Sequence, residues 1–182
     1  MNTKNILIES AIEVLNENAS CSMDVVAEKA GVTRRTLHRY FQSREHLIQD
    51  CLELIMTNTL TDVEAVIKTN GTPIEQLRQM FYNDVRKGKH FEFFQKFSEH
   101  LTESNSHSDM EEMGKLFYKL LDQLKLENVI ETTLSNEWIT YVWMGMVRSA
   151  NQALKDGAVA PIKVNELAWN AFSKGMVKNS DK

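Results

Sequence analysis

Apolar residues recur every three or four positions along most of the chain, the spacing that marks one face of an α-helix. In the first such stretch, residues 4–17, this face carries Ile8, Ala11, Ile12 and Leu15. Polar or glycine-containing segments separate the successive stretches, and no segment alternates convincingly as a strand would. The pattern predicts about nine helices, at residues 4–17, 22–30, 33–41, 43–66, 73–86, 91–101, 109–126, 136–155 and 164–177.

Composition supports the same fold class. Only 7 glycines and 2 prolines interrupt the 182 residues, and hydrophobic residues make up 42% of them, which is enough for a substantial core. No internal repeat is present, and no run of apolar residues is long enough to cross a membrane. We therefore expect an all-α protein with no membrane partner.

Residues 22–41 read as two short helices joined by a tight turn. Ser22 and Thr33 each stand where an N-cap belongs, and Gly31 between them suits a sharp turn because it has no Cβ. The buried side of the first helix is expected to carry Val25, Val26 and Ala30. In the second helix the inward positions are Leu37, Tyr40 and Phe41, which leaves Arg34, Arg35, His38 and Arg39 facing outward.

Positive charge is concentrated in this segment. Residues 29–44 contain five lysines and arginines and no acid, whereas the whole chain has a net charge of −4, so the remaining residues carry −9. A cationic helix on an acidic protein indicates contact with a polyanion. The alternative is an ordinary solvated face, and the helix-turn-helix frame argues against it.

Several short motifs in this region follow one family pattern: Ser22, Val26-Ala27, Ala30–Thr33, Thr36–His38, Tyr40-Phe41 and Arg44–Leu47. Near the C-terminus, Trp143–Gly145, Ala153-Leu154, Asp156-Gly157, Ala168-Trp169 and Lys174-Gly175 follow the same family. On these residues the chain resembles the TetR-family transcriptional regulators, strongly over residues 4–50. Two positions depart from the pattern, because His38 replaces the usual tyrosine and Arg35 stands where a small residue is common.

The resemblance implies an N-terminal three-helix helix-turn-helix DNA-binding domain, residues 1–46, followed by a C-terminal helical bundle for effector binding and dimerisation, residues 47–182. Arginine suits guanine in the major groove, and recognition helices read bases with their first residues, so Arg34 and Arg35 are expected to contact base edges. Arg39 could reach a base or a phosphate. Phosphate contacts are expected from Thr33, Thr36, His38 and Arg44, and from Ser22 if its hydroxyl is not used as the cap.

The same resemblance implies that the last two helices pair with their copies in a homodimer. Candidate interface residues are Trp138, Val142, Gly145, Ser149, Ala153, Leu167, Ala171 and Phe172, and the alternative is that these helices line the intrachain core. A small, hydrophobic effector could occupy the aromatic and methionine-rich centre of the bundle, where ordinary core packing is again the alternative. Candidate pocket residues are Met80, Phe94, Phe97, Phe117, Trp143 and Met146.

The expected function is therefore a DNA-binding transcriptional regulator, commonly a repressor in this family, that binds a palindromic operator as a homodimer and is released by an effector. A regulator with no small effector, controlled by a protein partner, is the alternative. No interior charge marks the polarity of an effector. The chain is expected to be cytoplasmic, and Cys21 and Cys51 to be packing residues rather than a redox pair.

An enzyme is the rival from another class. The chain has no glycine-rich phosphate loop, no Gly-x-Ser-x-Gly motif and no metal-binding helix signature, so we expect no catalytic residue, no metal and no cofactor. One polar cluster could suggest a metal site, but it straddles a serine-rich stretch in which polar residues are expected for solubility. This cluster consists of His100, Glu103, His107, Asp109, Glu111 and Glu112.

Overall fold

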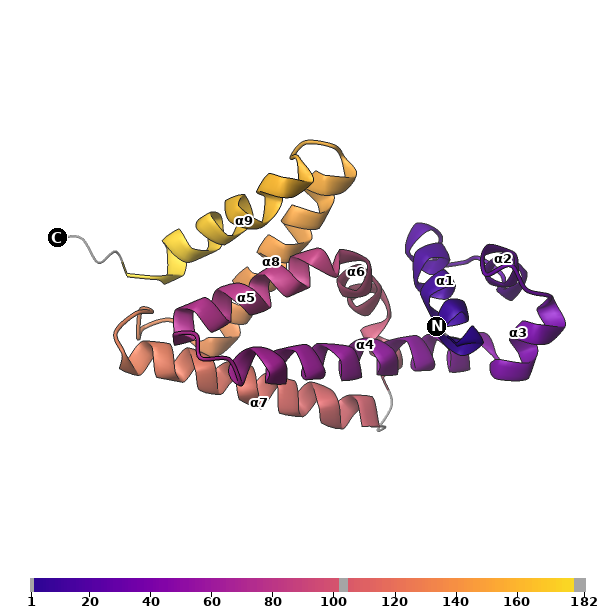
Figure 1. Cartoon of the computed structure of the whole chain (residues 1–182), viewed down its shortest axis with the longest axis horizontal. Coiled ribbons are helices and arrows are strands. Elements are labelled where there is room, and N and C mark those ends of the chain that lie inside the picture. Colours follow the sequence, from indigo (N-terminus) through magenta and orange to yellow (C-terminus); the bar gives the residue numbers. More distant parts are fainter. Residues whose placement is uncertain (1, 102–104, 179–182) are drawn as a thin grey trace. The chain divides into compact units, whose positions relative to one another are not determined.

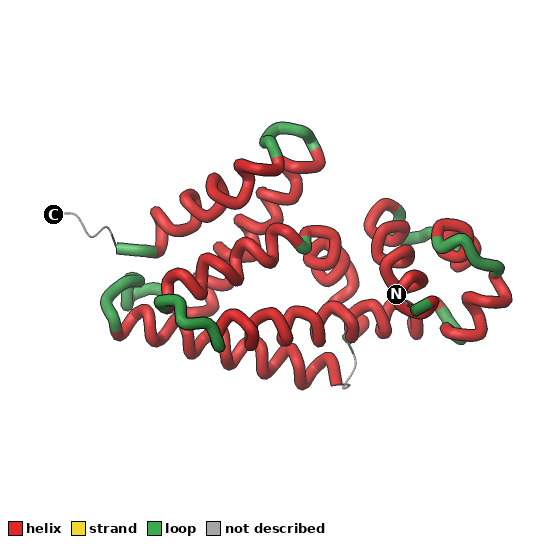
Figure 2. The backbone as a smooth tube through the Cα atoms, viewed as in Figure 1, coloured by secondary structure: helices red, strands yellow, loops and turns green. Residues whose placement is uncertain are grey.

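The computed structural model describes residues 2–101 and 105–178, without the side chains of residues 105–107. Helices joined by short loops make up this part of the chain (Figures 1 and 2). The α-helices are α1 (Thr3–Glu17), α2 (Met23–Lys29), α3 (Arg34–Tyr40), α4 (Arg44–Ile67), α5 (Pro73–Arg86), α6 (Gly88–Phe97), α7 (Asn105–Leu126), α8 (Asn136–Lys155) and α9 (Pro161–Met176), with one 3₁₀ turn at Ser98–His100. The prediction of an all-α fold is confirmed.

The described residues group into two compact units. The first unit contains the residues up to Thr59 and those between Lys89 and Met110. The second contains Leu60–Gly88 and the residues from Glu111 onward. None of the described helices is long and apolar enough to span a lipid bilayer.

The core of the first unit joins α6 to the N-terminal helices. One continuous cluster includes Leu15 of α1, Leu37 of α3, Leu52 of α4 and Phe93 of α6, all of them at most 1% exposed. Phe97 packs on Phe93 with ring centroids 4.6 Å apart. The three-helix motif therefore shares its hydrophobic core with a helix that follows it by almost fifty residues in the sequence.

The second unit is built around a cluster of aromatic rings from α5, α8 and α9, most of them packed edge to face. Phe81 of α5 is fully buried and lies 4.9 Å from the ring of Trp143, 5.8 Å from that of Trp169 and 5.6 Å from that of Phe172. Helices α8 and α9 pack against each other, and a short loop with a turn at Gly157 joins them (Figure 1). Burial of such large rings supplies a major part of the stability of a small domain.

Some helix boundaries differ from those expected. Helix α7 begins at Asn105 rather than Asp109, so part of the expected polar loop is helical, and residues 102–104 lie outside the described residues. Helix α9 begins at Pro161 rather than Val164, because proline is tolerated in the first turn of a helix. Val25 is 43% exposed, not buried as expected, because the inward stripe of the short helix α2 runs through Val26 and Ala27.

Helix α2 ends in a Schellman motif that sets the turn before α3. The N–H of Val32 donates to the carbonyl of Ala27 at 2.9 Å, and that of Gly31 to Glu28 at 3.0 Å. Gly31 has φ +67°, a left-handed conformation that side chains with a Cβ rarely adopt. This glycine therefore fixes the direction in which α3 leaves α2.

Substituting Gly31→Ala should lower the free energy of unfolding by about 1–2 kcal/mol, the cost of a left-handed residue with a Cβ. No atom lies within 4 Å of the added Cβ, so the loss comes from the backbone alone. Gly114→Ala is the matched control, because Gly114 is helical with open space around its Cβ position, and alanine there should stabilise by about 0.5–1 kcal/mol. Urea unfolding followed by circular dichroism measures the free energy of unfolding of both variants. Changes of the same sign in the two variants would contradict the left-handed conformation assigned to Gly31.

Candidate nucleic-acid interface

Helix α3 presents its cations on one exposed face. Arg34, Arg35, His38 and Arg39 are all exposed, whereas Leu37 between them is fully buried in the core of the first unit. Tyr40 and Phe41 continue the inward side, as the helical spacing predicted. The structure therefore places four of the eight residues predicted for DNA contact on one surface of the first unit.

The start of α3 is ordered by two hydroxyl groups. Thr33 is the N-cap, and its Oγ1 accepts the backbone N–H of Thr36 at 3.2 Å. The hydroxyls of the two threonines lie 3.0 Å apart. This arrangement holds both hydroxyls at the positive end of the helix, where an anionic group is stabilised by the helix dipole.

Arg34 has an acidic partner that the sequence analysis did not identify. Its Nη1 lies 3.0 Å from Oδ2 of Asp24 on α2, and the two side chains are 68% and 54% exposed. Asp24 precedes the acid-free segment, and only the turn at Gly31 brings it beside α3. Such an exposed ion pair contributes about 0–1 kcal/mol, so Arg34 can leave Asp24 for another anion at small cost.

The other basic side chains of this face, those of Arg35, His38 and Arg39, differ from Arg34 in their contacts. The guanidinium of Arg39 sits 5.3 Å from the ring centroid of Tyr40, a cation–π contact that keeps it along the helix. For Arg35 and His38, no hydrogen bond or ion pair is seen within residues 2–101 and 105–178. These two side chains therefore need to give up no intrachain partner in order to bind a ligand.

Arg44 takes up a position that its predicted phosphate contact did not suggest. Its Nη1 donates to the backbone carbonyl of Cys21 at 2.6 Å, and its Nη2 donates to that of Ala19. The start of α4 is thereby tied to the turn that precedes Ser22, the N-cap of α2. Ser22 makes no side-chain cap hydrogen bond, so its hydroxyl stays available at the helix N-terminus.

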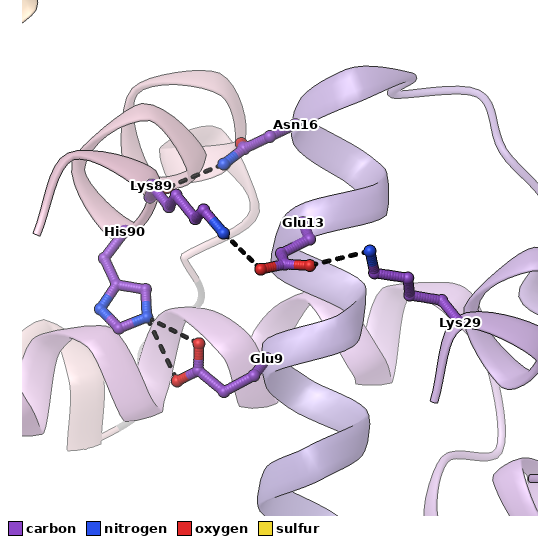
Figure 3. A network of polar contacts seen from close by, with 6 residues as sticks. All are labelled: Glu9, Glu13, Asn16, Lys29, Lys89 and His90. Carbon is purple, nitrogen blue, oxygen red and sulfur yellow. Dashed lines mark hydrogen bonds and ion pairs between the residues drawn. The ribbon is translucent and has the colours of Figure 1, made fainter. Parts of the chain in front are cut away.

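A polar network joins α6 to the helix-turn-helix (Figure 3). Glu13 of α1 lies between two lysines, with Oε2 3.1 Å from Nζ of Lys29 on α2 and Oε1 in contact with Nζ of Lys89 on α6. Asn16 donates to the carbonyl of Lys89 at 2.8 Å, and Nε2 of His90 lies 3.1 and 3.2 Å from the two carboxylate oxygens of Glu9. The network therefore links three helices of the first unit.

Hydrogen bonds from Lys89 and then from Lys29 hold the pKa of Glu13 below its usual value of 4.5. A lowered pKa in the folded state means that Glu13 stabilises the fold above pH 4.5 and that this stabilisation is lost as the pH falls through the folded-state pKa. Glu13→Gln should therefore unfold at lower urea than the wild type at pH 7, with a gap that narrows below pH 4.5. Glu28→Gln, an exposed acid on α2, is the control and should unfold at the same urea concentration as the wild type at pH 7.

The predicted pocket residues fall into both units. Phe94 and Phe97 pack against the core of the first unit. The other four belong to the second unit, where Met80 and Trp143 are buried and Phe117 and Met146 are half-buried. Their role as effector contacts stays a prediction.

The predicted dimer residues are mostly exposed on α8 and α9. Trp138 is 54% and Leu167 is 53% exposed, and the small residues Gly145, Ser149 and Ala171 are exposed as well. Val142 and Ala153 are half-buried. Phe172 differs, because it is only 1% exposed and its ring stacks on Phe81 inside its own unit.

One half-buried acid of the second unit was not foreseen from the sequence, which showed no interior charge. Nε1 of Trp143 donates to Oδ2 of Asp84 at 2.8 Å, and burial raises the pKa of this carboxyl to about 6. Asp84 follows an asparagine on an otherwise amphipathic helix, so in the sequence it resembles a surface residue. Only the fold brings it to Trp143, 59 residues later.

Residues 2–101 and 105–178 hold no group of three histidine, cysteine or acidic side chains placed to bind a metal. Of the polar cluster considered for this role, the structure describes neither Glu103 nor the side chain of His107. Both cysteines are buried and unpaired, and burial raises the pKa of the Cys51 thiol, which disfavours the reactive thiolate.

Comparison with known proteins agrees with the helix-turn-helix. Residues 7–51 match the family model of bacterial regulatory proteins, tetR family, whereas no curated protein matches the sequence. Among solved structures, the TetR-like regulator LfrR from Mycobacterium smegmatis, in complex with proflavine, is 18% identical with a TM-score of 0.74, covering 97% of this chain and 98% of that one.

Two further structures share the fold. The ketosteroid transcriptional regulator KstR2 of Mycobacterium tuberculosis is 14% identical with a TM-score of 0.79, over 98% of this chain and 96% of that one. A putative TetR-family regulator from Vibrio parahaemolyticus is 20% identical with a TM-score of 0.66, over 98% and 100%. At these identities the likeness concerns the fold, and the match to the family model concerns the N-terminal segment. Residues 7–51 thus match the tetR family of bacterial regulatory proteins, and the chain has the fold of TetR-like transcription regulators.

Proposed function

We propose that this protein is a repressor that binds a palindromic operator as a homodimer and is released by a small, hydrophobic effector. The observation that carries the proposal is the exposed face of α3, on which Arg34, Arg35 and Arg39 stand outward from a buried leucine. One helix fits the major groove of B-DNA, and its first residues reach the base edges. Arg34 and Arg35 read guanine, and Arg39 contacts a base or a phosphate.

Phosphate contacts fix the protein on the duplex. The hydroxyls of Thr33 and Thr36, at the start of α3, bind phosphate oxygens. The Ser22 hydroxyl does the same, because it makes no cap hydrogen bond. His38 lies on the same exposed face. Arg44 contributes through its charge and by holding the turn before Ser22. Such contacts position the protein, whereas the arginines specify the sequence.

A homodimer supplies a second α3 helix, which binds the second half-site of the operator. Trp138 and Leu167 are large apolar side chains that are more than half exposed, and exposed small residues on α8 and α9 allow close approach of a second copy. Paired copies would present two α3 helices to successive major grooves, about one helical turn or a multiple of it apart. Sedimentation at micromolar concentration should give the mass of two chains, and a monomer mass would contradict this arrangement.

An effector would act by shifting the population of two dimer states. A ligand that binds the DNA-incompetent state more tightly lowers operator affinity in proportion to its preference, typically by about 1–3 kcal/mol. The aromatic cluster around Trp143 supports an apolar ligand, and a fold relative, LfrR, was solved with proflavine.

The operator can be found by selecting bound sequences from random double-stranded DNA. The proposal expects an inverted repeat whose half-sites contain guanine at the positions read by Arg34 and Arg35. Binding should weaken steeply with salt, because cations on the protein displace counterions from DNA. Absence of any enriched sequence at low ionic strength would overturn the proposed function.

A further inference from the structure

One carboxylate lies beside the surface with which α3 is proposed to meet DNA. Asp24, in the first turn of α2, has a side chain that is 54% exposed, and its Oδ2 lies 3.0 Å from Nη1 of Arg34. Glu28, one turn further along the same helix, is also exposed, but no ion pair of Glu28 is seen in the part of the chain that the structure describes. An acid repels the phosphates of a duplex. A carboxylate in this place therefore weakens binding to every sequence unless it gains a partner on the DNA.

The charged ends of Asp24 and Arg34 are close together on the scale of DNA. Successive bases of one strand are about 3.4 Å apart along the helix axis, and the carboxylate lies 3.0 Å from the guanidinium. Asp24 has a short side chain, so its carboxylate stays near this place when the longer Arg34 turns toward a base. Where Arg34 reaches a base edge, the carboxylate of Asp24 therefore lies about one base-pair step away.

Reading a guanine leaves Asp24 without its cation. Guanine offers two acceptors, O6 and N7, to the planar fork of an arginine, and Arg34 gives up its weak contact with Asp24 to meet both of them. Arg34 is the one ion-pair partner that Asp24 has among residues 2–101 and 105–178. A charged group that the duplex covers and that lacks a hydrogen-bond donor is costly. A donor on the DNA would remove this cost.

The major groove offers a hydrogen-bond donor on only two of the four bases. Cytosine presents its exocyclic amino group and adenine presents another, whereas guanine and thymine present acceptors. The amino group of adenine lies next to the acceptor N7, which repels a carboxylate, and cytosine has no acceptor on this edge. Cytosine is therefore the base that suits Asp24 best, and guanine and thymine suit it least.

We propose that Asp24 is a second base-reading residue, which accepts a hydrogen bond from the amino group of a cytosine in the base pair next to the guanine that Arg34 reads. The inference rests on the proposed function, because it requires α3 to read an operator. It adds a specificity-determining residue on α2 and a second base to the expected half-site. Arg34 releases the carboxylate when it binds guanine, so the two contacts form together.

Parallel selections from random double-stranded DNA test this role with the full-length protein. The guanine read by Arg34 is the one that Arg34→Ala no longer selects, and the wild type should enrich a cytosine beside it. Asp24→Ala should keep the guanine and lose the cytosine. In binding titrations, the wild type should bind operators with guanine or thymine in place of this cytosine about fivefold or more weakly, and Asp24→Ala less than about twofold more weakly. Asp24→Asn should prefer adenine, because an amide pairs with both N6 and N7 of that base.

A modified operator tests the amino group itself. The cytosine is replaced by a pyrimidinone nucleoside, which lacks the exocyclic amino group, and fluorescence anisotropy measures the affinity. The wild type should bind the modified operator about fivefold or more weakly, because the carboxylate loses its donor. Asp24→Ala should bind the modified and the unmodified operator equally, since it makes no contact with this group.

Glu28→Gln is the matched control for charge. It removes one negative charge from the same helix, so like Asp24→Ala it should strengthen binding to all duplexes, but it should leave every base preference unchanged. The variants of Asp24 and Glu28 should remain folded, because both side chains are exposed. Circular dichroism checks this before each selection.

A change in Asp24→Ala that is confined to the guanine would mean that Asp24 acts only through Arg34, and would overturn the inference. Enrichment of guanine or thymine beside that guanine by the wild type would overturn it as well, and so would equal losses of wild type and Asp24→Ala on the modified operator. In each of these cases an operator is still selected, so the proposed function stands. Absence of any enriched operator would overturn the proposed function and the inference with it.

Discussion

Replacing Arg34, Arg35 and Arg39 together with alanine should abolish specific operator binding. Each base contact of this kind is worth about 1–3 kcal/mol, so the triple variant should lose at least about a hundredfold in affinity. The protein should remain folded, because all three side chains are exposed and, among the described residues, the one ion pair lost is the surface pair with Asp24. Fluorescence anisotropy with the selected operator measures the loss.

The control for this variant removes the same charge elsewhere. Lys68, Lys115 and Lys119 are exposed lysines outside the helix-turn-helix, and their joint replacement by alanine should change operator affinity only slightly. The salt dependence of operator binding separates the two triple variants further. Each lost phosphate contact reduces the slope of log K against log salt concentration by about 0.9. If both triple variants bound the operator equally well, α3 would not be the reading helix.

Phe81→Ala should destabilise the second unit by about 3–5 kcal/mol. Phe81 is fully buried, and its ring contacts those of Trp143, Trp169 and Phe172, so truncation leaves a cavity where three helices meet. All 3 tryptophans of the chain lie on α8 and α9, so tryptophan fluorescence during urea unfolding follows this unit.

Two comparisons test whether the loss comes from packing. Phe81→Leu, which keeps most of the buried volume, should cost less than the alanine variant. Leu126→Ala removes a leucine that is 89% exposed and should change stability by no more than about 0.5 kcal/mol. A cost for Leu126→Ala as large as that for Phe81→Ala would contradict the assigned core.

Helical periodicity predicted much of the fold because local spacing decides it. Leu37 and Arg39 are two positions apart and so lie on opposite faces of a helix, and the structure has Leu37 buried and Arg39 exposed. Helix ends were less predictable, since Pro161 suits the first turn of a helix as well as a break before it. The division into a DNA-binding and an effector domain at residue 46 stays a prediction.

Contacts between distant segments left no periodic signal. Glu13 meets Lys89, 76 residues away, and Asp84 meets Trp143, 59 residues away, yet each acid resembles a surface residue in its own helix. Asp24 lies ten residues before Arg34 and meets it only through the turn at Gly31. A single sequence gives the faces of the helices, and tertiary packing then decides which faces meet.

The pair between Asp24 and Arg34 bears on how a regulator of this kind would search a genome. If Arg34 reads bases as proposed, it must exchange the Asp24 carboxylate, 3.0 Å away, for a base edge at every site that it recognises. Only a well-placed guanine, offering two acceptors at once, competes with a weak surface pair. On sites without such a guanine the ion pair would persist, so mismatched duplex would gain no contact from Arg34 and would be left sooner.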